Sequence, residues 1–294
     1  MGSSSAIRSR ILSIKKTQKI TNAMYLIAST KLNKAKANLE NTRPYFDELK
    51  REIKRIFRTT NDIRSRFFYP VDKEPDDSDS TYGILVITAD KGLAGQYNQN
   101  VIRKTQTLLN EHEDSKLFVV GDYGRRYYEI HNIQMEMSFL YTAQNPTLER
   151  AREITEIMLQ QFEEGEIDKI FVVYTDMSRN SNITTNSVRL LPFHRSFFHT
   201  PEKEKKVEVH FELSPSPHEI LEGLIRSYLH GFVYSALINS FCSEQKARME
   251  AMNSANENAE ELLSDLSLVY NRARQAEITQ EITEISAGAM AQRG

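Results

Sequence analysis

The side chains that most often carry chemistry are few in this chain and lack the spacings that chemistry needs. There is one cysteine, Cys242, and there are seven histidines among 294 residues. The histidines show neither H-x-x-x-H spacing nor a cysteine partner, so the sequence predicts no metal site and no cofactor. Cys242 follows Phe241 in a helical stretch, which favours a packed thiol over a nucleophile. Adjacent carboxylates such as Glu260 and Glu261 are expected on a solvated helix surface, and no catalytic residue is predicted.

One turn has the composition of an anion site. Thr88-Ala-Asp-Lys-Gly-Leu-Ala-Gly95 follows a predicted strand, and its two glycines with Lys91 could cradle a phosphate at a helix N-terminus. The sequence has neither G-x-G-x-x-G after this strand nor G-x-x-x-x-G-K-[ST] elsewhere. We therefore favour a tight strand-to-helix turn with an exposed lysine, and a nucleotide-using enzyme is the alternative.

Composition limits the class of protein. Hydrophobic residues make up 39% and charged residues 27% of the chain, which suits long, exposed helices. A single cysteine cannot form an internal disulfide, as is usual in a reducing compartment. No run approaches about 18 apolar residues, and the N-terminus lacks an apolar signal core. We expect neither a membrane span nor a secretory leader.

Charge is uneven between the two ends. Residues 1–60 hold 14 Lys/Arg against 4 Asp/Glu, whereas residues 243–294 hold 5 against 9. Opposite charges favour pairing of the two ends with each other. A basic end also suits nucleic acid, so a coiled-coil scaffold or nucleic-acid-binding protein is an alternative.

Both ends carry the apolar repeat of a coiled coil. Alternating steps of four and three residues from Ile7 to Ile56 meet apolar residues at 12 of 15 positions. The mean step of 3.5 residues is that of a coiled coil. A second walk begins at Ile220, behind Ser216 as N-cap and Pro217 in the first turn. Its later positions include Ala259, Leu262, Leu266 and Val269.

The helix lengths exclude a compact arrangement. Residues 7–57 span about 75 Å and residues 217–290 about 110 Å as helices. An antiparallel pair is expected, in which the longer helix overhangs by about 35 Å. The last helical residues, 285–291, are small and nearly uncharged, which suits a narrow sleeve in a partner better than water.

The middle of the chain is predicted to be a separate α/β domain. Apolar runs at 82–88, 116–121 and 169–175 are typical of strands covered on both faces, hence of a parallel sheet. Helical patterns lie between them at 94–112 and at 146–164, the second capped by Asn145. Further strand candidates are 134–140, 184–191 and an edge strand at 207–213.

The predicted fold class is therefore α/β: a long antiparallel coiled coil of terminal helices plus a central doubly wound, Rossmann-like domain with a mainly parallel sheet. The predicted divisions are 1–69 for the N-terminal helix, 70–81 for an acidic linker, 82–215 for the α/β domain and 216–294 for the C-terminal helix.

Several segments closely resemble the gamma subunit of bacterial F-type ATP synthases. They are Ser243–Met252, Ala255–Ala259 and Tyr270–Ala289 near the C-terminus, Ile14–Met24 and Ala28–Ala35 in the first helix, and Asp90–Gly95 with Asn98 in the turn. The resemblance covers the whole chain and is most specific at the C-terminus. It implies a non-catalytic central-stalk rotor that carries torque between the membrane c ring and a catalytic alpha3-beta3 ring.

The same resemblance implies partners, location and contact residues. The partners are the alpha and beta subunits, the epsilon subunit and the c ring, with no nucleic acid. The location is the cytoplasmic face of the bacterial plasma membrane, reached only through the c ring. The implied contacts are Arg274, Gln275 and Arg248 with a catalytic beta subunit, Met24 and Lys91 at the collar of the ring, and Phe211 and Glu212 as a foot on the c ring. The alternatives are an interhelical salt bridge for Arg248, core packing for Met24 and a solvated turn for Lys91.

Overall fold

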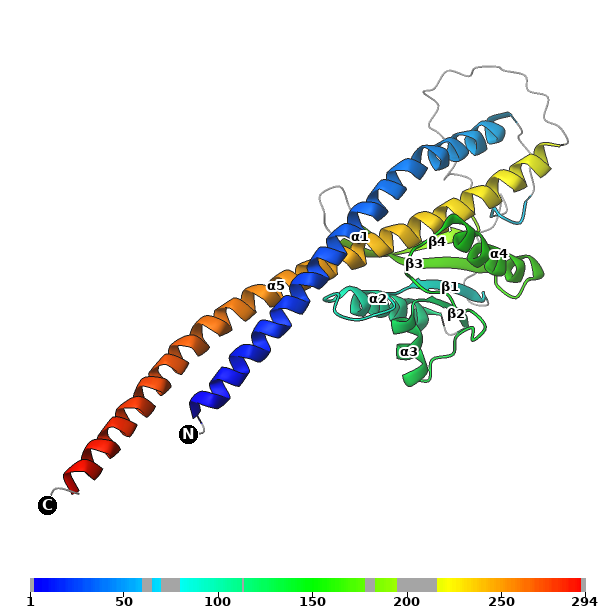
Figure 1. Ribbon diagram of the computed structural model, residues 1–294. Helices are drawn as coiled ribbons and strands as arrows, with labels where there is room; N and C mark the ends of the chain where they lie inside the picture. The colour runs from blue at the N-terminus through cyan, green and yellow to red at the C-terminus, as the bar shows by residue number, and fades with distance from the viewer. Residues whose placement is uncertain are drawn as a thin grey trace. The chain divides into compact units, whose positions relative to one another are not determined.

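The computed structural model describes residues 3–59, 65–69, 80–112, 114–177, 183–194 and 216–291. The chain divides into two compact units, Met1–Thr30 with Arg248–Gly294, and Lys31–Ala247. We call the first the tip unit and the second the body. Two long helices, α1 (Ser3–Thr59) and α5 (Pro217–Ala291), contribute residues to both (Figure 1).

In the tip unit, α1 and α5 lie side by side and run antiparallel (Figure 1). The Ser4 amide donates to the Glu277 carboxylate at 3.3 Å, and the Gln18 amide donates to Glu260 at 3.3 Å. Since Ser4 is at the start of α1, residues 278–291 of α5 extend past the paired region by about 21 Å. This overhang is shorter than the predicted length of about 35 Å, in part because α1 begins at Ser3 rather than at Ile7.

The α1 repeat is confirmed along its whole length. Every position of the walk from Ile7 to Ile56 is buried or half-buried. Pro44 lies inside this helix, which continues unbroken to Thr59. The apolar repeat was therefore sufficient to locate the inner face of α1.

The α5 repeat holds as far as Ala259 and beyond it only in part: Leu266 is half-buried as predicted, whereas the predictions for Leu262 and Val269 were wrong. Leu262 and Val269 are 48% and 49% exposed, whereas their neighbours Leu263 and Tyr270 are half-buried. After Ala259 the next inner position comes four residues later, at Leu263, rather than three residues later. The inner face therefore moves by one residue. A straight helix has 3.6 residues per turn and drifts against a 3.5-residue repeat, and such a shift compensates for the drift.

The body contains a four-stranded sheet among its described residues. Its strands are β1 (Tyr82–Ile87), β2 (Ser115–Val120), β3 (Lys169–Met177) and β4 (Ile183–Leu191), in the order β2-β1-β3-β4. β1 is parallel to β2 and to β3, and β4 is antiparallel to β3. The predicted mainly parallel sheet is confirmed.

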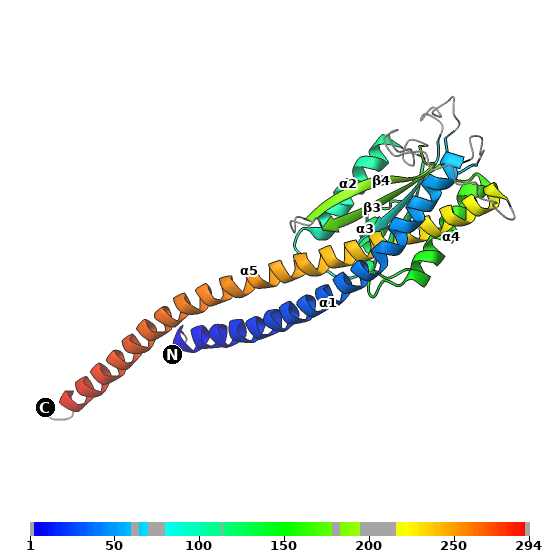
Figure 2. The same ribbon diagram turned by 90° about the horizontal axis from the view of Figure 1, so that it is seen from above.

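Helices cover both faces of this sheet, which explains the continuous apolar runs (Figures 1 and 2). Ile84 and Val86 of β1 pack in one core with residues of α2 (Tyr97–Glu111) and α3 (Asp122–Ile130). Leu85 and Ile87 face a second core made with α4 (Leu148–Glu164) and with the body segments of α1 and α5. Neighbouring side chains on a strand point to opposite faces, so both alternate sets had to be apolar.

The remaining expectations had mixed outcomes. Ser216 caps α5 as predicted, since the Glu219 amide donates to its hydroxyl at 3.2 Å. The cap of α4 is Thr147 and not Asn145, because Asn145 is in the left-handed region at φ 48°. Residues 134–140 form no strand, and α3 was not predicted. The 207–213 candidate lies outside the described residues, and the proposed domain divisions remain a proposal.

Candidate functional site

The turn after β1 is tied together by its own side chains. The Ala89 amide donates to the Asn98 carboxamide oxygen at 2.9 Å. The Asn98 carboxamide nitrogen in turn reaches the Lys91 carbonyl at 3.5 Å. The glycines serve this geometry, since Gly95 has φ 54°. This side of the turn is a tight strand-to-helix connection, as the sequence favoured.

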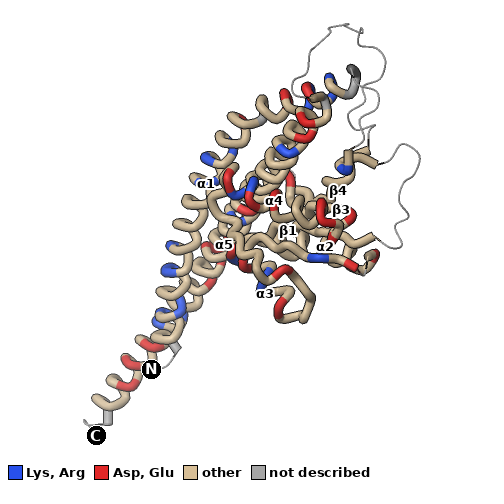
Figure 3. Tube along the Cα trace, turned by 90° about the vertical axis from the view of Figure 1, so that its right-hand side faces the viewer, with Lys and Arg blue, Asp and Glu red and all other residues tan. Residues whose placement is uncertain are grey.

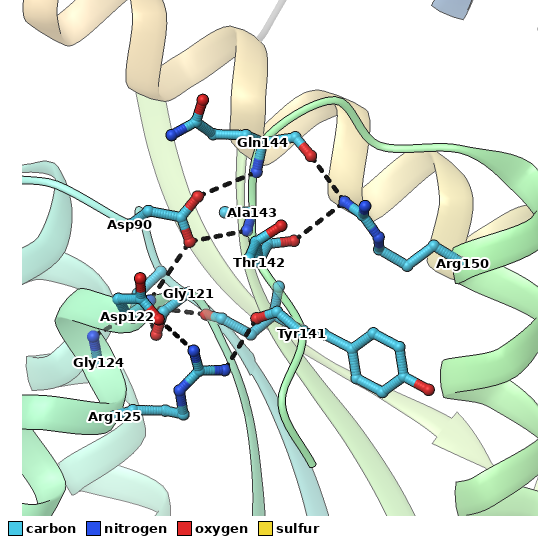
Figure 4. Close-up of polar contacts among 12 residues, drawn as sticks. Asp90, Gly121, Asp122, Gly124, Arg125, Tyr141, Thr142, Ala143, Gln144 and Arg150 are labelled. Atoms are coloured by element: carbon cyan, nitrogen blue, oxygen red, sulfur yellow. Dashed lines mark hydrogen bonds and ion pairs between the residues drawn. The ribbon is translucent and has the colours of Figure 1, made fainter.

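The Asp90 carboxylate of this turn bonds to backbone amides that lie outside the turn. Asp90 accepts hydrogen bonds from the amides of Ala143 at 2.9 Å, Gln144 at 3.2 Å and Asp122 at 3.3 Å (Figure 4). Asp122 is the first residue of α3, where a negative charge is favourable. The protein's own carboxylate therefore satisfies these three amides, one of them at the N-terminus of α3.

Two arginines bond to backbone carbonyls of the loop whose Ala143 and Gln144 amides bond to Asp90. Arg125 donates to the Tyr141 carbonyl at 3.1 Å and forms an ion pair with Asp122 (Figure 4). Arg150 of α4 donates to the Gln144 carbonyl at 2.6 Å and to the Thr142 carbonyl at 3.2 Å. A guanidinium has several donors in a fixed plane, so it can fix several carbonyls at once. The result is a braced loop, and not a reaction centre.

This network could not be found from the sequence. Asp90 and its partner Ala143 are 53 residues apart, and no motif connects them. The only local signal was the D-K-G-L-A-G turn itself. The braced turn leaves Lys91 exposed and holds Leu93 at φ 61° with 64% of its surface exposed. A leucine in the left-handed region is uncommon, and such strain persists only where the surroundings fix it.

The other predicted contact residues are placed along the two helices. Arg274 and Gln275 are exposed on α5, and Arg248 and Met24 are half-buried in the tip unit. Arg248 and Arg274 are about 39 Å apart along α5, so they do not form one cluster. Lys91 belongs to the body, and Phe211 and Glu212 lie outside the described residues.

The tip unit leaves large apolar side chains uncovered. They include Leu12, Ile20, Leu26 and Ile27 on α1, and Leu268, Ile278, Ile282 and Ile285 on α5. Ile285 is 72% exposed and Ile20 is 61% exposed. Several exposed apolar side chains on one element indicate a surface made for a partner.

Charge on the tip unit follows the two helices. The first thirty residues carry Arg8, Arg10, Lys15, Lys16 and Lys19 and no acidic residue, while α5 is acidic toward its end (Figure 3). The hydrogen bonds from α1 to Glu260 and Glu277 of α5 join the basic helix to the acidic one. The hydrogen bond from Ser4 also holds the pKa of the Glu277 carboxyl below its usual value.

Reactive groups in the body are buried or dispersed. Cys242 is fully buried, and burial raises the pKa of its thiol to about 11 despite the opposing charge of Lys36. This agrees with the predicted packed thiol. Within the ranges that the structure describes, no three His, Cys, Asp or Glu side chains are grouped to hold a metal ion. No helix in the same ranges is long and apolar enough to cross a bilayer.

These features define a class of protein: an α/β body whose helices α1 and α5 also form an antiparallel coiled-coil unit with an uncovered apolar and charged surface. A family model described as ATP synthase matches residues 3–291. The chain is 42% identical to the ATP synthase gamma chain of Caldanaerobacter subterraneus subsp. tengcongensis, over 95% of this chain and 97% of the relative. It is 39% identical to the ATP synthase gamma chain of Acetivibrio thermocellus, over 97% of both chains. The chain belongs to the ATP synthase gamma chain family.

A solved structure supports the fold independently of close sequence similarity. It is a chain of the Euglena gracilis mitochondrial ATP synthase, determined as the rotor in rotational state 1. The TM-score is 0.62 at 15% identity, over 94% of this chain and 99% of the other. At this identity the likeness concerns the fold alone, and it matches the predicted combination of terminal helices and α/β domain.

Proposed function

We propose that this chain is the central-stalk rotor subunit of the F1 sector of an ATP synthase. It carries torque between the membrane c ring and the catalytic alpha3-beta3 ring, and so couples ion translocation to ATP synthesis and hydrolysis. The observation that carries the proposal is the tip unit: an antiparallel helix pair with exposed apolar side chains, in a member of this family. The Euglena neighbour, described as rotor, is consistent with this role.

The mechanism follows from asymmetry. Three identical catalytic subunits around one helix pair meet different faces of it at any moment. The pair can shift a subunit between open and closed forms only by contacting the two forms unequally. A shift from mostly open to mostly closed takes about 5 kcal/mol of differential contact. The unlike faces of the tip unit, basic on α1 and acidic on α5, suit this task.

The partners are the alpha and beta subunits around the tip unit, and the epsilon subunit and the c ring at the body. The location is the cytoplasmic face of the bacterial plasma membrane, held there through the c ring. Neither arrangement needs a membrane-spanning helix in this chain.

The proposed contacts fall into three groups. Arg274, Gln275 and Arg248 bond a catalytic beta subunit, Met24 and Lys91 lie at the collar of the ring, and Phe211 with Glu212 forms the foot on the c ring. The exposure of Arg274, Gln275 and Lys91 supports their part in this assignment. Met24 and Arg248 are half-buried, so they also contribute to packing within the tip unit.

Purification tests the function directly. A tagged chain taken from native membranes in mild detergent is expected to bring alpha, beta, epsilon and c subunits with it, and cryo-electron microscopy is expected to place it on the threefold axis. A complex that holds the chain at its periphery would contradict the proposal. Recovery of nucleic acid in place of these subunits, lost at high salt, would favour the scaffold alternative.

Replacing Arg274 and Gln275 by alanine tests the proposed beta-subunit contact. Both side chains are exposed, so the fold and the thermal midpoint are expected to stay unchanged. The loss of hydrogen bonds made by a charged and a neutral donor amounts to about 2 kcal/mol, and turnover is expected to fall roughly tenfold or more. ATPase turnover of the assembled complex measures the effect. Arg272→Ala, also exposed on α5, is the matched control, and equal turnover in both variants would remove the contact.

A further inference from the structure

Torque must pass between the body sheet and α5, and apolar packing alone is poorly suited to carry it. The core shared by α4, the sheet and α5 is made of non-directional apolar contacts, and it includes Ile154, Met158, Ile225 and Leu229. Such contacts resist separation but specify orientation weakly, because the hydrophobic effect has no direction. Hydrogen bonds and ion pairs do have a direction.

Two buried serines of α5 bond directly to the backbone of β3. The Thr175 amide donates to the Ser240 hydroxyl at 3.2 Å, and the Ser243 hydroxyl donates to the Thr175 carbonyl at 3.3 Å. All three residues are at most 1% exposed. The ladder between β1 and β3 ends at Val86 and Val173, two residues before Thr175. The serines therefore satisfy backbone groups that β1 no longer reaches.

A second polar connection joins α5 to α4. Arg226 donates to Glu156 at 3.0 Å and forms an ion pair with Glu163, and His230 Nε2 lies 2.7 Å from the other oxygen of Glu156. Burial alone would lower the pKa of Arg226, but the hydrogen bond that Arg226 donates to Glu163 and the charges of Glu163, Glu156 and Glu222 raise that pKa above its usual value. The guanidinium therefore stays charged. The His230 side chain is 13% exposed and that of Glu156 is 45% exposed.

We propose that these two connections, the serine tether (Ser240 and Ser243 on Thr175) and the charged tether (Arg226 and His230 on Glu156 and Glu163), form the torque joint that fixes α5 to the sheet and to α4. They are centred about 20 Å apart along α5 and about a quarter turn apart around it. One tether would leave α5 free to pivot or to roll against the sheet. Two tethers that leave different faces of α5 and reach two different elements prevent both sliding and rolling of α5 against the sheet. The inference rests on the proposed rotor function.

The test uses the assembled complex. Ser240→Ala with Ser243→Ala removes the serine tether, and Arg226→Met with His230→Gln removes the charged tether. We expect the combined variant to lower ion pumping per ATP hydrolysed by about threefold or more, and each pair alone to lower it less. The matched controls are Thr155→Val, which removes a buried hydroxyl bonded within α4, and Lys116→Met, which breaks an exposed ion pair with Glu166.

A mechanical measurement separates a joint from a merely stabilising role. With the alpha3-beta3 ring fixed to glass, a bead is attached to the body through Thr107→Cys on the exposed face of α2; the buried Cys242 thiol does not compete. Loss of the tethers is expected to broaden the distribution of bead angles during each catalytic pause. A change in thermal stability alone would not broaden it. The Arg226→Met variant leaves the buried serines in place, and it tests the joint even if the serine variant fails to fold.

The outcomes are distinct. Pumping ratios and angle distributions equal to those of the controls overturn the joint and leave the rotor function standing. A Thr107→Cys complex with both tethers intact whose bead does not rotate overturns the rotor function and the joint with it. Broader angles with a lower pumping ratio at unchanged assembly support the joint.

Discussion

Deletion of residues 278–294 is expected to cut coupled ATP synthesis by roughly fivefold or more while the rest of the chain stays folded. Ile278, Ile282 and Ile285 are 45%, 59% and 72% exposed, and each is worth about 1.5–3 kcal/mol when fully buried in a partner. Residues 278–291 extend past Ser4, so the deletion removes no pairing with α1 that the structure describes. ATP synthesis in liposomes and the thermal midpoint of the free chain measure the two effects.

A full-length variant distinguishes apolar contact from helix length. Ile282→Gln with Ile285→Gln keeps the helix and removes most of the exposed apolar surface, and it is expected to reproduce most of the loss. Glu281→Gln with Glu284→Gln on the same turns is the matched control. Unchanged coupled synthesis in the deletion variant would show that the overhang does not seat the rotor.

Gly121→Ala is expected to destabilise the body strongly. Gly121 has φ 97°, which L side chains rarely adopt. An added Cβ would lie 2.4 Å from the Thr88 carbonyl oxygen and 2.8 Å from that of Ala89, and backbone atoms cannot easily move away. Strain and clash together are expected to lower the free energy of unfolding by about 3 kcal/mol or more.

The measurement is the thermal or denaturant-induced unfolding of the free chain, with circular dichroism as the readout. For a unit of this size, about 3 kcal/mol corresponds to a fall of roughly 6–12 °C in Tm. Gly223→Ala on α5 is the matched control, because a Cβ added at Gly223 would have no neighbouring side chain or element within 4 Å. The control is expected to be neutral or to stabilise by up to about 1 kcal/mol. A Gly121→Ala variant with the same Tm as the wild type would show that the turn tolerates the strain.

The sequence by itself determined the elements whose signals are local and periodic. The repeat from Ile7 to Ile56 located the inner face of α1, because each helical turn repeats the same demand for burial. The three apolar runs located β1, β2 and β3, because a strand covered on both faces is apolar at successive positions. The specific C-terminal segments led to the family, which the comparisons then established.

The tertiary structure alone decided the contacts between segments distant in the chain. Asp90 meets the amides of residues 143 and 144, and Ser243 meets the carbonyl of Thr175, and no spacing in the sequence encodes either pairing. The shift of the α5 seam from Leu262 to Leu263 also depended on the partner helix, because a 3.5-residue repeat and a 3.6-residue helix separate gradually. A local pattern predicts which face of an element is buried. Which other element covers that face is decided only when the whole chain packs.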